Sequence, residues 1–255
     1  MTRYRFFASI RHYLRSIRSK GGYGVHSPFA FNFITEILNP SENHYYYSFH
    51  NIEKVRYYLT TQNRNIKLKN GDLISIKDIS KKIGTTSTRN SQMLFKIAIA
   101  QKSNRIIELG TGLGIVSAYF AATSQKAHIT TISNNNSLQE LAKENHQKLG
   151  LRNINYVTGD IKESLINELT QINKVDLIYF EDLKQGNTTI EYFNIALPFV
   201  TNKSIFIIQN IHLSKEMNMA WESIYKHPQI TASFELLNMG IVFLDKTLNK
   251  EHFYA

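Results

Sequence analysis

The sequence predicts an α/β protein with a mostly parallel sheet, an antiparallel hairpin near the C-terminus and a helical N-terminal extension. From residue 104 onwards, short apolar runs alternate with stretches of helical spacing, which is the pattern of parallel strands joined by covering helices. Near the end, two strand-like runs follow one another directly and indicate a hairpin. The 255 residues are 42% hydrophobic, enough for one large domain. We expect residues 1–103 to form a basic helical region and residues 104–255 to form the α/β domain.

The alternation predicts five parallel strands and the helices that follow them. The strand-like runs are residues 105–109, 128–132, 154–157, 175–180 and 204–208. Helical runs begin at about residue 115 and continue with 138–149, 161–169, 188–197 and 216–225. The expected hairpin consists of residues 230–237 and 240–244.

The N-terminal region is predicted to be helical in three places. Residues 3–19 place apolar side chains on one face, with arginines beside it. We expect a surface helix whose apolar face either packs on the protein or lies on a membrane or RNA. A second helix begins after Ser27, a plausible N-cap followed by proline, and stops before Pro40. Residues 73–102 are expected to be helical, with a break at Gly84 and a new cap at Ser87 or Thr88. Residues 41–72 allow no clear prediction.

Positive charge is concentrated at the front of the chain. Residues 1–105 hold 18 Lys and Arg against 5 Asp and Glu, a net charge of +13, whereas residues 106–255 hold 12 against 15, a net charge of −3. This split favours an anionic partner, RNA or a membrane surface, for the N-terminal region. The alternative is a solvated face that serves solubility. The chain has no cysteine and no signal-peptide core, so we expect a cytoplasmic protein.

The strongest motif is the glycine loop that follows the first predicted strand. It contains Glu108, Gly110, Thr111, Gly112 and Gly114, and it opens a predicted helix. Glycines let the backbone approach a ligand with no side chain between. A nicotinamide fingerprint would need glycine where this chain has isoleucine. An acid two residues before the first glycine suits S-adenosylmethionine (SAM), whose ammonium and sulfonium groups are cationic. The alternative is a generic tight turn between strand and helix.

Several motifs in order along the chain resemble one enzyme family. Residues 24–29 read G-V-H-S-P-F, and residues 108–114 read E-L-G-T-G-L-G. Together with residues 217–228, which include Trp221, and the endings at 240–243 and 251–253, they resemble class I SAM-dependent methyltransferases of the catechol O-methyltransferase type. The resemblance is to a group common in Bacteroidota. It implies a Rossmann-like sheet, SAM as cofactor and a small-molecule methyl acceptor.

The resemblance assigns further cofactor residues in this chain. The family ends its second strand with an acid that binds the ribose hydroxyls, and the matching residue here is Ser133. A serine makes one hydrogen bond where a carboxylate makes a charge-assisted pair, so we expect weakened binding. Asp160 matches the turn that contacts adenine, a role compatible with a helix N-cap. Glu181 is assigned both to the cofactor and to a metal.

The resemblance also implies a divalent cation and a catalytic base. The metal positions fall on Glu181, Gln209 and Asn210, of which the family normally has Asp at the first two. Loss of one carboxylate should weaken Mg²⁺, so we expect weak or no dependence on it. Lys184 matches the lysine that removes the proton of the acceptor hydroxyl, and His212 lies close enough in sequence to be an alternative base. A solvated lysine and a structural histidine are the opposing interpretations.

The preferred function is SAM-dependent O-methyl transfer to a small molecule, by a protein that is either a monomer or a homodimer. Ser133 and Gln209 support a second hypothesis, a catalytically degenerate methyltransferase fold that serves as a binding or assembly module. The basic front of the chain supports a third, RNA methylation or RNA binding.

Overall fold

The computed structural model describes residues 11–16, 22–39, 47–67, 71–81, 87–181 and 183–255. The chain divides into two compact units. We call Asn43–Glu168 the central unit, and Met1–Glu42 together with Leu169–Ala255 the terminal unit. The expected boundary between residues 103 and 104 stays a prediction. No helix among the described residues is long and apolar enough to cross a membrane.

The central unit contains three parallel strands in the order β3-β4-β5. They are β3 (Arg105–Leu109), β4 (His128–Ser133) and β5 (Ile154–Thr158). The helices that follow them are α6 (Ile115–Ala121), α7 (Asn136–Lys148) and α8 (Ile161–Ile172). All three strands and all three helices agree with the predicted alternation to within a few residues. Gly150, with a φ of 72°, follows the end of α7 as expected.

The rest of the central unit is a helical layer with a small hairpin. Its elements are α3 (Tyr47–Thr61), β1 (Asn65–Lys67), β2 (Leu73–Ser75), α4 (Ile76–Ile79) and α5 (Thr88–Ala100). The helical prediction for residues 73–102 is wrong at its start, because residues 73–75 pair as a strand with β1. The Ser87 cap is confirmed, since its hydroxyl accepts the Asn90 N–H. Gly84 lies outside the described residues.

The terminal unit contains five strands in the order β10-β8-β9-β7-β6. They are β6 (Val175–Phe180), β7 (Val200–Gln209), β8 (Ala232–Glu235), β9 (Met239–Phe243) and β10 (Glu251–Tyr254). Strands β6 and β7 are parallel, and the hairpin β8–β9 joins antiparallel to β7, as predicted. The prediction missed β10, which lies parallel to β8.

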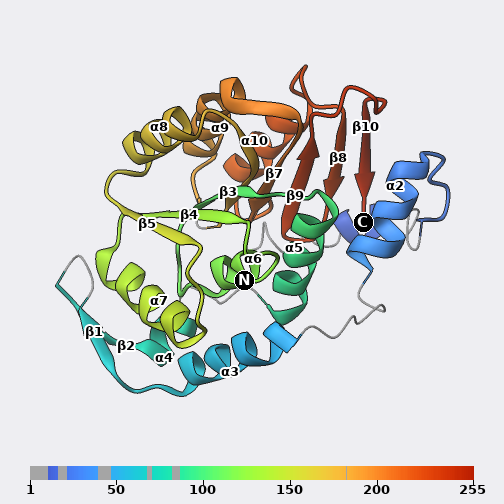
Figure 1. Ribbon diagram of the computed structural model, residues 1–255. Coiled ribbons are helices and arrows are strands. Elements are labelled where there is room, and N and C mark those ends of the chain that lie inside the picture. The colour runs from blue at the N-terminus through green and yellow to red at the C-terminus, as the bar shows by residue number, and fades with distance from the viewer. Residues whose placement is uncertain (1–10, 17–21, 40–46, 68–70, 82–86, 182) are drawn as a thin grey trace. The chain divides into compact units, whose positions relative to one another are not determined.

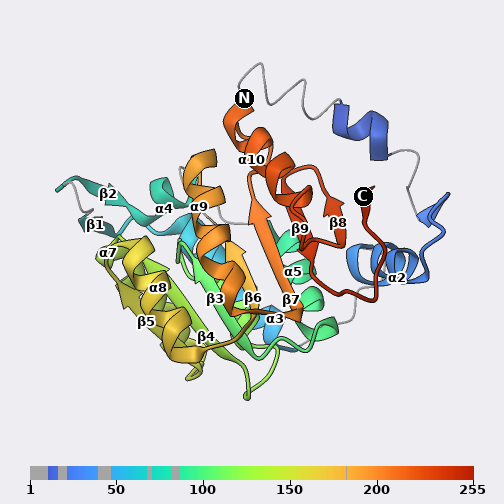
Figure 2. The ribbon, with the colours of Figure 1, turned by 90° about the horizontal axis from the view of Figure 1, so that it is seen from above.

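Two helices cover the parallel part of the terminal unit. They are α9 (Gly186–Ala196), followed by the 3-10 turn Leu197–Phe199, and α10 (Lys215–Tyr225). Helices α9 and α10 pack against each other, and both views show them side by side along β7 (Figures 1 and 2). The indole of Trp221 on α10 lies so close to Gly240 that a Cβ there would be 2.4 Å from it.

A segment from the front of the chain completes the terminal unit. Helix α2 (Pro28–Asn32) begins at the predicted cap Ser27 and continues as a π-helix over Phe33–Leu38, beside β8 and β10 in Figure 1. The ring of Phe29 lies 5.1 Å from that of Phe243, and the ring of Phe33 lies 4.6 Å from that of Phe234. Aromatic packing therefore holds the N-terminal segment on the C-terminal hairpin.

The first predicted helix is helical over residues 11–16, and its other residues lie outside the described part. Of the two alternatives for its apolar face, packing on the protein does not hold for Tyr13 and Leu14, which are 65% and 61% exposed, whereas His12 is 5% exposed. The Arg15 guanidinium donates to the Tyr254 hydroxyl at 3.1 Å. This bond and the approach of His12 to Glu235 are polar contacts between this turn of helix and the strands of the same unit.

Candidate functional site

The glycine loop lies in the central unit between β3 and α6. Gly110, Gly112 and Gly114 have φ angles of 99°, 51° and 79°, a left-handed region that residues with a Cβ rarely adopt. The Gly110 N–H donates to the Ile132 carbonyl at 2.9 Å, which ties the loop to β4. The loop thus keeps its backbone bare of side chains at three positions, and it fits the predicted cofactor.

Beneath the loop is a buried polar network that involves Glu108 and Thr111. The Thr131 hydroxyl donates to Glu108 Oε2 at 2.6 Å and lies 2.8 Å from the Thr111 hydroxyl. The Gln139 amide donates to the Thr131 carbonyl at 3.1 Å. Glu108 is fully buried, and this burial raises its pKa to about 8 against the hydrogen bonds from Thr131 and Ser117. In the structure, Glu108 and Thr111 therefore support the loop from below.

The other end of the loop is held by His146 of α7. Its Nε2 lies 2.6 Å from the Gly114 carbonyl, and its Nδ1 lies 2.7 Å from the Tyr156 hydroxyl. The carbonyl accepts, so Nε2 carries the proton and Nδ1 accepts from the tyrosine. Burial lowers the pKa of His146 to about 4, against the bond to Gly114, and keeps the ring neutral. Sequence reasoning missed His146, because its partner is a backbone atom.

Two further predicted cofactor residues also lie in the central unit. The Ser133 hydroxyl accepts the Asn135 N–H at 3.1 Å and forms a tight turn after β4. Asp160 accepts the Glu163 N–H at 3.0 Å, which places it at the start of α8. Asp160 therefore caps the N-terminus of α8, and this role is compatible with the predicted contact with adenine.

The predicted acceptor-side residues lie in the terminal unit, at one edge of its sheet. Phe180 of β6 pairs with Ile208 of β7, so Glu181 and Gln209 follow at the same edge. Asn210 has a φ of 62°, and its N–H donates to the Asn238 carbonyl at 2.7 Å. Lys184 is exposed in the loop after β6. The register of β6 and β7 therefore places Glu181 and Gln209 next to each other at this edge.

The donor chemistry of this edge does not fit a resident Mg²⁺. Of the three predicted ligands, Glu181 is the one carboxylate, and Gln209 and Asn210 are neutral amides. Hard divalent cations need several anionic oxygens to offset their dehydration. Gln209 Oε1 is buried and has no hydrogen-bond partner among the described residues. Such a neutral oxygen is better suited to accept a hydrogen bond from a bound methyl-acceptor molecule than to serve as a ligand of a divalent cation.

His212 lies in a buried polar cluster of the terminal unit. Its Nδ1 is 3.0 Å from Asn218 Oδ1, and its Nε2 is 3.3 Å from Glu235 Oε1. Two more histidines, His12 and His252, approach the same carboxylate. Sequence reasoning missed Glu235, a single acid inside a predicted strand, and it missed both of those histidines as its neighbours.

The fold and the loop define a Rossmann-like methyltransferase, and comparison with known proteins supports this class. A family model described as a methyltransferase domain matches residues 100–253, more than half of the chain. The protein therefore belongs to this methyltransferase family, and the predicted fold class and enzyme class are confirmed. No curated protein matches the chain.

Solved structures of similar fold include three O-methyltransferases. A putative caffeoyl-CoA O-methyltransferase from Staphylococcus aureus has a TM-score of 0.56 and 18% identity, over 66% of this chain and 90% of that one. An O-methyltransferase from Bacillus cereus in complex with SAH has a TM-score of 0.56 and 16% identity, over 76% and 90%. TomG from Streptomyces achromogenes, in complex with SAM, has a TM-score of 0.56 and 15% identity, over 66% and 86%.

Replacement of Gly114 by alanine should destabilise the protein more than replacement of Gly150. Both residues have positive φ, but a Cβ on Gly114 would be 2.7 Å from the Ala142 Cβ, whereas a Cβ on Gly150 meets nothing within 4 Å. Gly150→Ala should cost about 1 kcal/mol of backbone strain, and Gly114→Ala about 2 kcal/mol more from overpacking. Urea denaturation measures both. Equal losses would show that the contact with α7 does not constrain the loop.

Replacement of Glu108 by glutamine should remove a loss of stability that accompanies the rise of pH from 6.5 to 8. The pKa of Glu108 is raised when folded, so its stabilising contribution is present below the unfolded value of 4.5 and is lost as pH rises through about 8. His146 has the opposite slope, but only below its unfolded value of 6.5. Between pH 6.5 and 8 the free energy of unfolding of the natural protein should therefore fall by about 2 kcal/mol. That of Glu108→Gln should not show this fall. Parallel pH profiles of the two proteins in urea denaturation would contradict this assignment.

Proposed function

We propose that the protein transfers a methyl group from SAM to an oxygen of a small-molecule acceptor. The observation that carries the proposal is the glycine loop of left-handed backbone after β3 in the central unit. In the terminal unit, Glu181 and Gln209 follow the paired ends of β6 and β7 and supply polar groups for an acceptor. The solved O-methyltransferases of similar fold, two of them bound to SAM or SAH, support the choice of cofactor and of reaction. Membership of the group common in Bacteroidota is part of the same proposal.

The cofactor is assigned to the residues around the glycine loop. Gly110, Gly112 and Gly114 would lie against it with bare backbone, Ser133 would bind one ribose hydroxyl and Asp160 would contact the adenine. SAM, when bound, supplies an electrophilic methyl group. Because the transfer is a direct displacement, the main task of the protein is to hold and orient the two reactants.

The acceptor is assigned to the edge of β6 and β7. Glu181 and Asn210 would orient the acceptor hydroxyl, and Gln209 Oε1 would accept a hydrogen bond from a second donor group of the same molecule. The amine Nζ of Lys184, when neutral, would take the hydroxyl proton and so raise the nucleophilicity of the oxygen. His212 is not needed as the base, since both of its ring nitrogens lie in the Glu235 cluster. No step requires Mg²⁺.

The degenerate binding module remains the second candidate, and Ser133 is the residue that favours it. The Ser133 hydroxyl already accepts the Asn135 N–H, so it has less capacity for a ribose than a carboxylate has. A protein of this kind would hold SAM weakly and transfer no methyl group. The anionic partner of the basic N-terminal region stays a prediction.

Ser133→Asp should tighten SAM binding by roughly 1–2 kcal/mol, the scale of a hydrogen bond to a charged group. A carboxylate at this position could keep the bond from the Asn135 N–H and add a charged acceptor for the ribose. Ser133→Asn is the matched control, because it keeps the local bond without the charge. Calorimetric titration measures all three proteins. If neither the natural protein nor Ser133→Asp binds SAM at millimolar concentration, the cofactor assignment is wrong.

Lys184→Met should abolish methyl transfer to a panel of phenolic and other hydroxyl acceptors and leave SAM affinity unchanged. The change removes the proton acceptor from the exposed loop after β6 and preserves the length of the side chain. Lys174→Met, at the opposite end of β6, is the control and should retain full activity. Radiolabelled methyl transfer and SAM titration give the two readouts. Retention of activity in Lys184→Met would remove this residue from the mechanism.

A further inference from the structure

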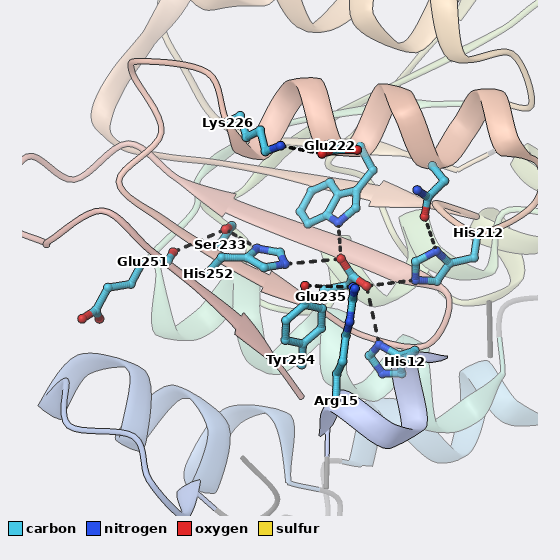
Figure 3. Close-up of polar contacts among 12 residues, drawn as sticks. His12, Arg15, His212, Glu222, Lys226, Ser233, Glu235, Glu251, His252 and Tyr254 are labelled. Carbon is cyan, nitrogen blue, oxygen red and sulfur yellow. Dashed lines mark hydrogen bonds and ion pairs between the residues drawn. The ribbon is translucent and has the colours of Figure 1, made fainter. Parts of the chain in front are cut away.

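Three histidines converge on one buried carboxylate in the terminal unit. Glu235 ends β8, His252 lies on β10, His212 lies between β7 and α10, and His12 lies on the first turn of helix (Figure 3). From Oε1 of Glu235, the His212 Nε2 is 3.3 Å away and the His12 Nδ1 is 3.8 Å away. From Oε2, the His252 Nε2 is 3.3 Å away.

In two of the three histidines, the ring nitrogen that points away from Glu235 is hydrogen-bonded to an oxygen atom. His212 Nδ1 lies 3.0 Å from Asn218 Oδ1, and His252 Nδ1 lies 2.7 Å from the Ser233 hydroxyl, which itself donates to the Glu251 carbonyl. Oxygen acceptors at Nδ1 place the proton there, so each neutral ring turns the lone pair of Nε2 toward Glu235. Figure 3 shows these contacts on the outer side of each ring.

The inner side of the cluster is short of positive charge. Among the residues that the structure describes, none forms a hydrogen bond of acceptable geometry with His12 Nδ1, His212 Nε2 or His252 Nε2, although all three atoms are buried. With neutral rings, lone pairs face carboxylate oxygens at 3.3 Å, which is repulsive. Either protons on the rings or a bound cation must lie between these atoms.

The distances favour a metal ion that is shared by His12, His212 and Glu235. Their three ligand atoms lie within 4.8 Å of one another. Ligand atoms around a tetrahedral zinc ion are about 3.3 Å apart, given bond lengths of roughly 2.0–2.1 Å. The His212–Glu235 separation already has this value, and the remaining atoms need shifts of about 1 Å. Trp221 Nε1 donates to Oε2 at 2.8 Å, which leaves Oε1 as the coordinating oxygen.

A cavity of about 180 Å³ adjoins these three side chains, and Arg11, Arg15 and Tyr254 also line it. A metal with three protein ligands keeps a fourth position for water or a ligand. Imidazole and carboxylate together suit divalent first-row transition ions better than Mg²⁺ or Ca²⁺. We propose that His12, His212 and Glu235 bind a divalent transition-metal ion such as Zn²⁺, with its open position toward this cavity and His252 as a further ligand or positioning residue.

The site would join the front of the chain to its end. His12 belongs to helical residues 11–16, and the other ligands belong to the C-terminal part of the same unit. In the bound state the metal would hold this helical turn on the sheet, together with the bond between Arg15 and Tyr254. The proposal does not depend on the assigned methyl acceptor or on SAM.

The test is metal binding by the full-length protein after treatment with a chelator. Titration with Zn²⁺ in competition with a chromogenic chelator should show one tight site, and Co²⁺ should give the strong visible absorption of a four-coordinate ion. Glu235→Gln and His212→Gln should each weaken binding at least roughly 100-fold, and Asn218→Leu roughly 10-fold. His128→Gln, which removes an exposed histidine of the central unit, is the control and should bind like the natural protein.

Thermal unfolding supplies a second readout on the same proteins. Zn²⁺ should raise the melting temperature of the natural protein and of His128→Gln, and it should have little effect on Glu235→Gln. If the stripped natural protein binds neither Zn²⁺ nor Co²⁺, the cluster is held together by protons and the proposal is wrong, whatever the variants do. Equal binding by the natural protein and a folded Glu235→Gln would place the metal elsewhere and would also overturn it.

Discussion

Gly114 is the point on which the candidate cofactor site depends, because two constraints meet there. Its backbone is left-handed, with a φ of 79°, and its carbonyl accepts the proton of His146 Nε2 at 2.6 Å. The same histidine and Ala142 fill the space that a Cβ would need. Helix α7 therefore sets the height of the loop above the sheet. Burial keeps the His146 ring neutral, which leaves its Nδ1 able to accept from the Tyr156 hydroxyl.

The pKa values of two buried ionisable groups beneath the loop are shifted, and the two shifts make stability change with pH in opposite directions. Glu108 resists losing its proton and His146 resists gaining one, so each stays neutral in the folded protein over part of the pH range. The Thr131 hydroxyl donates to Glu108 Oε2 and His146 Nε2 donates to the Gly114 carbonyl, whereas the buried Glu108 Oε1 has no partner among the described residues. The loop thus rests on a polar network of low net charge, which avoids the cost of a bare buried ion.

Periodicity and turn residues sufficed to predict the alternating part of the fold. The strands β3 to β7 are apolar and short, and caps such as Ser87 act locally, so neighbouring residues contain the signal. Strand β10 and the pair β1–β2 were missed because three or four residues show no period, and their pairing depends on distant partners. The burial of His12 in residues 11–16 was not predicted, since its partner is a carboxylate more than 200 positions away.

In the candidate site, too, the residues marked by a local sequence signal were predictable, and those that depend on distant partners were not. The glycine loop is contiguous, and the edge residues Glu181 and Gln209 each end a predicted strand, so their positions follow from the element order. Nothing local marks Glu235, His146 or Gln139 as polar residues of a core, because each is explained only by partners on other elements.

The Glu235 cluster shows why such residues carry information once the fold is known. Trp221 donates to this buried carboxyl at 2.8 Å, and three histidine rings face it. A carboxylate in this position costs free energy that an apolar residue in β8 would avoid. The cost is offset only when positive charge lies between the carboxylate and the rings, and the outer hydrogen bonds of His212 and His252 direct lone pairs to that place. A divalent ion bound to these lone pairs supplies that charge at a single position between the carboxylate and the rings.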